Sequence, residues 1–174
     1  GGGGSGSGEI NYITNPDAAI NADGWVESDG SIGVSRTEVS AQLPREPLTD
    51  TALEMLNSGA GTGYVYTRFT LGESDKNKVL KVQWEQLVGS TYASGDYKLE
   101  MFVNSASNYG GAYTEIPFND NVAGVVGIPQ TNGQYVNTFY ADDTEDYYEL
   151  RITRVAGGSA ATDYISIANV ITGP

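Results

Sequence analysis

The chain of 174 residues contains no cysteine and no histidine. Without cysteine it forms neither a disulfide framework nor a thiolate zinc site. Without histidine it lacks the commonest general base and the commonest ligand of transition metals. Ser-His-Asp and Cys-His catalytic machinery are therefore excluded within this chain. We expect a protein that is not an enzyme and that needs no cofactor.

Basic residues are also scarce, with 9 lysines and arginines against 22 aspartates and glutamates and a net charge of −13. The resulting negative field repels polyanions, so we expect neither nucleic acid nor an anionic membrane surface as a partner. No apolar run approaches the roughly 18 residues that a membrane-spanning helix needs. We therefore expect no membrane insertion.

Glycine is abundant instead, and the first eight residues read GGGGSGSG. A stretch of this composition behaves as a flexible linker, because it has almost no side chains that could pack. We assign residues 1–8 to a linker that joins the rest of the chain to something upstream. Residues 9–174 have the length of one domain and show no internal repeat.

Short alternating runs fill that domain, separated by glycine, asparagine, aspartate and serine, as strands with one buried face require. The runs cover residues 31–40, 51–57, 62–71, 78–88, 96–104, 112–118, 134–141, 147–155 and 163–172. Helical periodicity is limited to an ambiguous stretch at residues 50–56. About nine or ten strands without intervening helices predict an all-β sandwich or barrel.

Three segments carry a likeness to a known family. Asn11–Trp25 (NYITNPDAAINADGW), Val79–Tyr97 (VLKVQWEQLVGSTYASGDY) and Asn169–Pro174 (NVITGP) resemble the opening, middle and closing segments of jelly-roll domains in tailed-phage virion proteins. Those domains are related to carbohydrate-binding modules. The resemblance implies an antiparallel jelly-roll β-sandwich that serves, outside the cell, as a virion surface module of a fibre, tail or capsid decoration protein.

Such a module acts in assembly, with other virion proteins or copies of itself as partners, a trimer included, and it presents a face for adhesion to cell-surface glycans. Two alternatives remain open. A stand-alone carbohydrate-binding module would bind glycans in its own right. A polysaccharide depolymerase would need two carboxylates about 5 to 9.5 Å apart across a groove, and no local motif nominates such a pair.

Calcium is the one metal that the family resemblance implies, because some relatives hold a structural calcium ion on an aspartate of the last strand. The matching position here is Ala168, whose side chain has no ligand atom. Elsewhere, Asp142, Asp143, Glu145 and Asp146 crowd one turn and offer the hard oxygen ligands that calcium takes. We name these four as a candidate metal site, against the alternative of a solvated turn between strands.

Tyrosine dominates the aromatic residues, with 12 tyrosines against 4 phenylalanines and 2 tryptophans. Sugar rings stack their C–H faces on aromatic rings, and the tyrosine hydroxyl adds a polar tip. The candidates for glycan binding are Tyr92, Tyr109, Tyr113, Tyr135 and Tyr140. The alternative for each of them is packing in or beside the core, since tyrosine favours strands.

Both tryptophans are assigned to the structural core. Trp25 ends the opening motif, where Gly24 lets the chain bend so that the indole turns inward. Trp84 alternates with Leu80 and Val82 and therefore shares their face of the strand. We expect both indoles to be buried.

Overall fold

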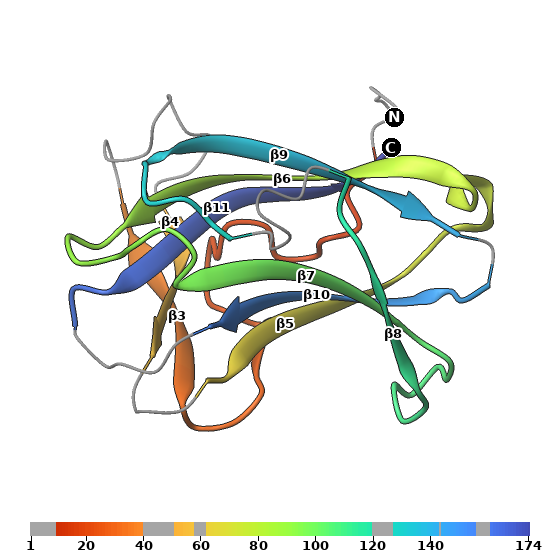
Figure 1. The fold of residues 1–174 in the computed structure, drawn as a ribbon, viewed down its shortest axis with the longest axis horizontal. Coiled ribbons are helices and arrows are strands. Elements are labelled where there is room, and N and C mark those ends of the chain that lie inside the picture. Colours follow the sequence, from red (N-terminus) through yellow and green to blue (C-terminus); the bar gives the residue numbers. More distant parts are fainter. Residues whose placement is uncertain (1–9, 40–50, 58–61, 120–126, 143, 156–160) are drawn as a thin grey trace.

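The computed structural model describes residues 10–39, 51–57, 62–119, 127–142, 144–155 and 161–174. Within these residues, ten strands form two five-stranded sheets that lie face to face (Figure 1). All pairings between neighbouring strands are antiparallel. This arrangement confirms the predicted antiparallel β-sandwich, while the predicted linker 1–8 lies outside the described residues.

One sheet has β10 at its centre, and we call it the β10 sheet. Its strands, in spatial order, are β2 (Val26–Glu27), β5 (Tyr64–Thr70), β10 (Tyr147–Arg154), β7 (Tyr97–Asn104) and β8 (Tyr113–Ile116). The other, the β11 sheet, consists of β3 (Ile32–Glu38), β4 (Thr51–Asn57), β11 (Tyr164–Gly173), β6 (Lys78–Val88) and β9 (Gly133–Ala141).

Nine of these strands match the nine predicted runs, and β2, with only two residues, was not predicted. The ambiguous stretch at residues 50–56 is a strand from Thr51 onward, because it pairs with both β3 and β11. The described residues contain one short 3-10 turn, η1 (Glu73–Asp75). No helix among them is long and apolar enough to span a bilayer.

The core lies between the sheets and is built from every second residue of the strands, as the pleat dictates. Its largest fully buried side chains come from seven strands and one connection, and they are Tyr97, Tyr148, Phe139, Ile32, Leu53, Met55, Leu80, Met101, Ile128, Leu150, Ile165 and Ile167. The alternating neighbours of these residues must therefore point to the outer side of each sheet. This division decides which side chains a ligand can reach.

The opening and closing motifs of the sequence pack against each other. The side-chain amide of Asn11 accepts a hydrogen bond from the N–H of Thr172 and donates one to the carbonyl of Val170, each over 3.0 Å. The N–H of Val170 donates to the carbonyl of Pro16. Two of the three segments with the family likeness, 158 residues apart at Asn11 and Asn169, thus form one contact in the fold.

Both tryptophans lie in the core cluster, with Trp25 only 5% and Trp84 only 6% exposed. Gly24 has a φ of +88°, which a residue with a side chain rarely adopts, and this turn directs Trp25 inward. The indole Nε1 of Trp25 donates to the carbonyl of Asn15 over 2.8 Å. That of Trp84 donates to the Gln86 side chain over 2.9 Å.

Candidate functional site

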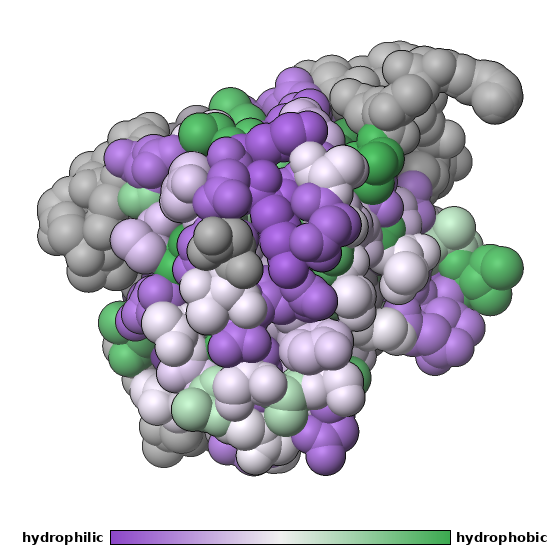
Figure 2. Space-filling model, turned by 90° about the vertical axis from the view of Figure 1, so that its right-hand side faces the viewer, coloured by the Kyte–Doolittle hydropathy of each residue, from purple (hydrophilic) through white to green (hydrophobic). Residues whose placement is uncertain are grey.

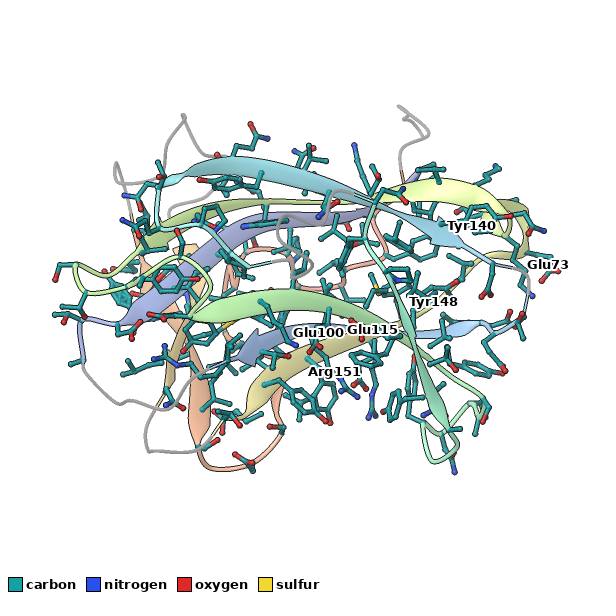
Figure 3. The ribbon with its side chains drawn as sticks, viewed as in Figure 1. Glu73, Glu100, Glu115, Tyr140, Tyr148 and Arg151 are labelled. Carbon is teal, nitrogen blue, oxygen red and sulfur yellow. The ribbon has the colours of Figure 1, made fainter. Side chains whose placement is uncertain are left out.

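The outer side of the β10 sheet gathers aromatic and charged side chains, and we call it the β10 face. These residues alternate with core residues along their strands, so their side chains point away from the β11 sheet. The β10 face consists of Tyr64, Tyr66 and Arg68 on β5, Tyr147, Glu149, Arg151 and Thr153 on β10, Lys98, Glu100 and Phe102 on β7, and Tyr113 and Glu115 on β8. In Figure 3, Glu100, Glu115 and Arg151 lie near one another over this sheet, whereas Tyr148 lies between the sheets.

Glu149 is the centre of the β10 face and is 1% exposed. Its Oε1 accepts hydrogen bonds from Nε of Arg68 over 2.8 Å and from the hydroxyl of Tyr113 over 2.9 Å. Its Oε2 accepts one from Nε of Arg151 over 2.6 Å. A buried carboxylate needs such partners, because removing a charge from water is costly without them. One carboxylate therefore fixes two guanidinium groups and a phenol.

The guanidinium of Arg151 lies among three aromatic rings. Its Cζ is 4.3 Å from the ring centroid of Tyr64, 4.0 Å from that of Phe102 and 4.8 Å from that of Tyr113. Attraction between a cation and an aromatic ring at these distances adds to the hydrogen bond with Glu149. The side chain is 13% exposed, so packing restricts its rotamers, and neither of its Nη atoms is among the fully buried polar atoms that lack a partner.

Arg68, on the neighbouring strand β5, has a similar environment. Its Cζ is 4.6 Å from the ring centroid of Tyr66 and 4.2 Å from that of Tyr109, which lies in the β7–β8 connection. Partial burial alone would lower the pKa of Arg68, but the hydrogen bond to Glu149 and the nearby negative charges raise it overall. The guanidinium therefore keeps its charge.

Tyr109 and Tyr113 extend the β10 face at the β8 side. The Tyr109 hydroxyl lies 2.9 Å from the carbonyl oxygen of Tyr148 and 3.1 Å from that of Phe69. Burial raises the pKa of Tyr109 to about 12. Burial also raises the pKa of Tyr113, and the hydrogen bond that its hydroxyl donates to Glu149 raises it further. Both hydroxyls therefore remain protonated donors at neutral pH.

A second charged pair lies beside the first. Nζ of Lys98 is 3.2 Å from Oε2 of Glu100, and the hydroxyl of Thr153 donates to Oε1 of the same carboxylate over 2.6 Å. Arg151 and Glu100 are direct cross-strand neighbours. The β10 face thus combines fixed donors, fixed acceptors and aromatic rings, which are the groups that recognise a polyhydroxylated ring.

The five predicted sugar-binding tyrosines do not gather in one place. Tyr113 belongs to the β10 face and Tyr109 packs against its Arg68, but Tyr92 is 5% exposed and its hydroxyl donates to the carbonyl of Ile128 over 2.7 Å. The Tyr92 prediction is wrong, because its ring stacks on Tyr97 inside the core and cannot contact a sugar.

The remaining two tyrosines belong to the β11 sheet. Tyr135 packs beside the core, with its ring stacked on Trp84 at a centroid distance of 5.7 Å. Tyr140 is 49% exposed on the outer side of β9, and its hydroxyl donates to the Asn77 side chain. Neither contributes to the β10 face, so their role in glycan binding stays a prediction without neighbours that support it.

Sequence reasoning missed most of the β10 face. It nominated none of Tyr64, Tyr66, Arg68, Phe102, Glu149 or Arg151 as a site residue. The alternation in the run 147–155 does separate Glu149 and Arg151 from the core residues of β10. A search for charged residues facing away from the core on central strands would have found that pair.

The acidic turn between β9 and β10 does not form a metal site among the described residues. Nζ of Lys76 lies 2.6 Å from Oδ1 of Asp146, so a lysine already supplies the positive charge there. Oδ1 of Asp142 accepts the N–H of Thr144. The described residues contain no group of three or more carboxylates that could hold a metal ion. Glu145 therefore has no such group around it, and Asp143 lies outside the described residues.

The surface at this end of the sandwich is hydrophilic (Figure 2). Lys76 also lies 3.3 Å from Glu73, so it links the β5–β6 connection to the β9–β10 connection. Ala168 stands where the family resemblance places a calcium-binding aspartate. It is fully buried in a small apolar cluster. The described residues thus favour the solvated, ion-paired turn over the candidate calcium site.

A surface hollow of about 340 Å³ lies along the opening motif. It is lined by Thr14, Asn15, Ala19, Ile20, Asn21, Asp23 and Gly24. This lining contains no aromatic ring and one carboxylate. A sugar would find nothing to stack on there, so the β10 face is the better candidate.

No protein-family model matches the chain, and no curated protein matches its sequence. The fold, in contrast, recurs among solved structures. One similar structure is the enzymatically active domain of tailspike protein 4 of bacteriophage CBA120, with a TM-score of 0.66 and 15% sequence identity. The alignment covers 94% of this chain but 21% of the tailspike chain, so this chain spans about a fifth of that protein's length.

Two other similar structures are carbohydrate-binding modules. The CBM22-1 xylan-binding domain of Paenibacillus barcinonensis Xyn10C has a TM-score of 0.56 and 10% identity, with 90% of each chain covered. The family 11 module of the Clostridium thermocellum cellulase Lic26A-Cel5E has a TM-score of 0.54 and 14% identity, with 97% of this chain and 95% of that chain covered. At these identities the likeness shows the fold alone, which is the jelly-roll β-sandwich that these modules share.

Proposed function

We propose that this protein is a non-catalytic carbohydrate-binding module and that its β10 face is the glycan-binding surface. The observation that carries the proposal is the cluster around Glu149, in which one buried carboxylate fixes Arg68, Arg151 and Tyr113. Aromatic rings surround these polar groups. The similarity of the fold to carbohydrate-binding modules supports the proposal.

The chemistry of the β10 face suits a sugar. Aromatic rings offer surfaces for the C–H faces of a pyranose, and arginine donors and carboxylate acceptors bond its hydroxyl groups. The ion pairs fix the side chains before a ligand arrives. Less conformational entropy is then lost on binding, which raises affinity without additional contacts.

The test is a glycan array followed by affinity electrophoresis with the glycans that bind. Tyr66→Ala and Tyr113→Ala should each weaken binding by about ten-fold or more, because each removes a ring of the β10 face. Tyr140→Ala is the matched control, since Tyr140 is an exposed tyrosine on the other sheet. Absence of saturable binding to any glycan, or equal losses in all three variants, would overturn the proposal.

A second candidate function is a virion surface module that assembles with other virion proteins or with copies of itself, outside the cell. The similarity to the phage tailspike domain favours it, together with the family-like motifs and the Gly/Ser stretch at residues 1–8. Light scattering tests the self-assembly part. A stable trimer would support this candidate, and a monomer that binds glycans at every concentration would favour the stand-alone module.

Catalysis is the third function, and we propose that it is absent. The tailspike domain is described as enzymatically active, but no local motif of this chain nominates the pair of carboxylates that hydrolysis of a polysaccharide needs. Release of reducing ends from any polysaccharide that the protein binds would overturn this part of the proposal.

A further inference from the structure

We propose that the β10 face selects sugars that carry a carboxylate, such as uronic acids, and that Arg151 is the group that recognises the carboxylate. This inference rests on the proposed function, since it names the class of glycan that the same surface takes. It starts from the hydrogen bonds of the two arginines, which leave most of their donors unused.

Arg151 has five N–H donors, and the structure accounts for one of them. Its Nε donates to Glu149, whereas no acceptor within the described part of the chain takes a hydrogen bond from Nη1 or Nη2. The ends of its guanidinium therefore form a fork of parallel donors. The rings of Tyr64 and Phe102, 4.3 and 4.0 Å from Cζ, hold the plane of that fork.

Arg68 repeats the pattern with a more exposed side chain. Its Nε also donates to Glu149, and its Nη2 lies at a long 3.4 Å from the hydroxyl of Tyr113. Its side chain is 37% exposed. A ligand that reaches Arg151 would therefore also come near a second guanidinium.

The charges of Arg68, Arg151 and Glu149 do not cancel, although Glu115 balances the β10 face as a whole. Arg68 and Arg151 share the single carboxylate of Glu149, which leaves one excess positive charge. Lys98 is paired with Glu100, so that pair adds no net charge. A local positive charge in a chain of net charge −13 points to a ligand with a negative group at that place.

The fork matches a carboxylate better than a hydroxyl group. A carboxylate accepts two parallel hydrogen bonds from a guanidinium, and bonds between two charged groups are roughly twice as strong as neutral ones. A single sugar hydroxyl offers one oxygen to the same fork. A carboxylate on the sugar should therefore be preferred over a hydroxymethyl group or an ester.

Two features of the chain oppose an anionic ligand. The overall negative field acts at long range, but at physiological ionic strength charges beyond about 8 Å are largely screened. Glu115 acts more directly, because it is exposed on β8, across Phe102 from Glu149. We expect a bidentate contact with Arg151 to outweigh both effects, and neutralising Glu115 should strengthen binding further.

The test compares acidic oligosaccharides with their methyl esters by isothermal titration calorimetry at physiological salt. The panel contains oligogalacturonate, oligoguluronate, a hyaluronan oligosaccharide and sialyllactose, with neutral glycans from the array beside them. At least one free acid should bind about ten-fold or more tightly than its own ester. Esterification keeps the sugar ring and removes only the charge, so this comparison needs no variant of the protein.

Three variants then assign the effect to Arg151. Arg151→Gln should abolish the preference for the acid, Arg151→Lys should retain part of it, and Glu115→Gln should increase it. Equal affinity for acids and esters, or binding of neutral glycans only, would overturn this inference and leave the proposed function intact. Absence of binding to every glycan would instead overturn the proposed function.

Discussion

The outer sides of the two sheets differ in which polar side chains a ligand can reach. On the β10 face, a buried charge is surrounded by rings and by partly exposed arginines. On the outer side of the β11 sheet, which we call the β11 face, one half is buried. Its apolar side chains are Ala52 on β4, Leu87 on β6 and Ala168 on β11, with Val39 beside them. The carboxylate of Glu85, opposite Ala168, is buried there too and accepts a hydrogen bond from the side chain of Asn169.

The other half of the β11 face is open but offers little chemistry. Val79, Val136 and Tyr140 are each about half exposed there, and Val79 lies directly opposite Tyr140. A recognition surface needs polar groups that are both fixed and reachable. The β10 face has them because Glu149 is bonded to arginines that remain partly exposed, whereas the buried Glu85 of the β11 face is bonded to the buried Asn169. A buried charge therefore organises a recognition surface only where its partners stay within reach of a ligand.

Replacing Glu149 should have the largest effect on stability. Glu149→Ala leaves Arg68 and Arg151 without their shared partner, and breaking a buried ion pair from one side costs about 3–5 kcal/mol. Urea denaturation measures the change in the free energy of unfolding. Glu115→Ala is the control on the same face, and its exposed side chain should cost within about 0.5 kcal/mol. Similar losses in both variants would show that Glu149 does not organise the β10 face.

Leu87 tests the buried half of the β11 face. Leu87→Ala should lower the free energy of unfolding by about 2–3 kcal/mol, because the side chain is 7% exposed and its removal leaves a cavity. Val79→Ala on the same strand and the same side should cost far less, since Val79 is 58% exposed. If both substitutions change the free energy of unfolding little in the same urea experiment, Leu87 is as exposed to solvent as Val79 and this half of the β11 face is not buried.

Alkaline pH should destabilise the protein through its buried tyrosines. Burial raises the pKa of Tyr97 and of Tyr109 to about 12, above the value of about 10 in the unfolded chain. The folded state then binds the phenol proton more tightly than the unfolded chain does. The stabilisation that each buried tyrosine contributes is therefore complete below pH 10 and is lost as the pH rises toward 12. The loss is about 1.4 kcal/mol per pH unit for a buried tyrosine such as Tyr97.

Urea denaturation at pH values from 8 to about 11.5 measures how steeply the free energy of unfolding falls with pH. In Tyr109→Phe, the part of this fall that ionisation of Tyr109 causes should disappear. The part that Tyr97 causes in the core should remain. If the free energy of unfolding falls with pH as steeply in this variant as in the parent protein, the environment of Tyr109 does not resist its ionisation.

The sequence predicted the strands well because their alternation is a local property. It separated Tyr148 and Leu150 from Glu149 and Arg151 on β10 without knowledge of the neighbours. The residues 50–56 were ambiguous because their pattern fits either periodicity, and only pairing with β3 and β11 makes them a strand. The two residues of β2 are too few to show a period.

The site was harder to predict because it depends on register between strands. That Tyr64, Phe102 and Tyr113 meet at Arg151 follows from the pairing of four strands, which no local pattern contains. Tyr92 was a candidate because a tyrosine ring can stack on a sugar. Its ring is nevertheless buried, since the turn folds back and stacks it on Tyr97. Residue type alone could not separate these cases.

The smallest expected effect concerns the open half of the β11 face. Val136→Thr keeps the shape and the strand preference of the side chain and changes only its polarity at a site that is 58% exposed. The free energy of unfolding should stay within about 0.5 kcal/mol of the parent value, and glycan affinity should not change. Val136 lies opposite Gln83, at the middle of β6, so a sugar bound over β6 and β9 would contact this pair. A clear loss of affinity in this variant would therefore place the glycan on the β11 face and reverse the assignment of the two faces.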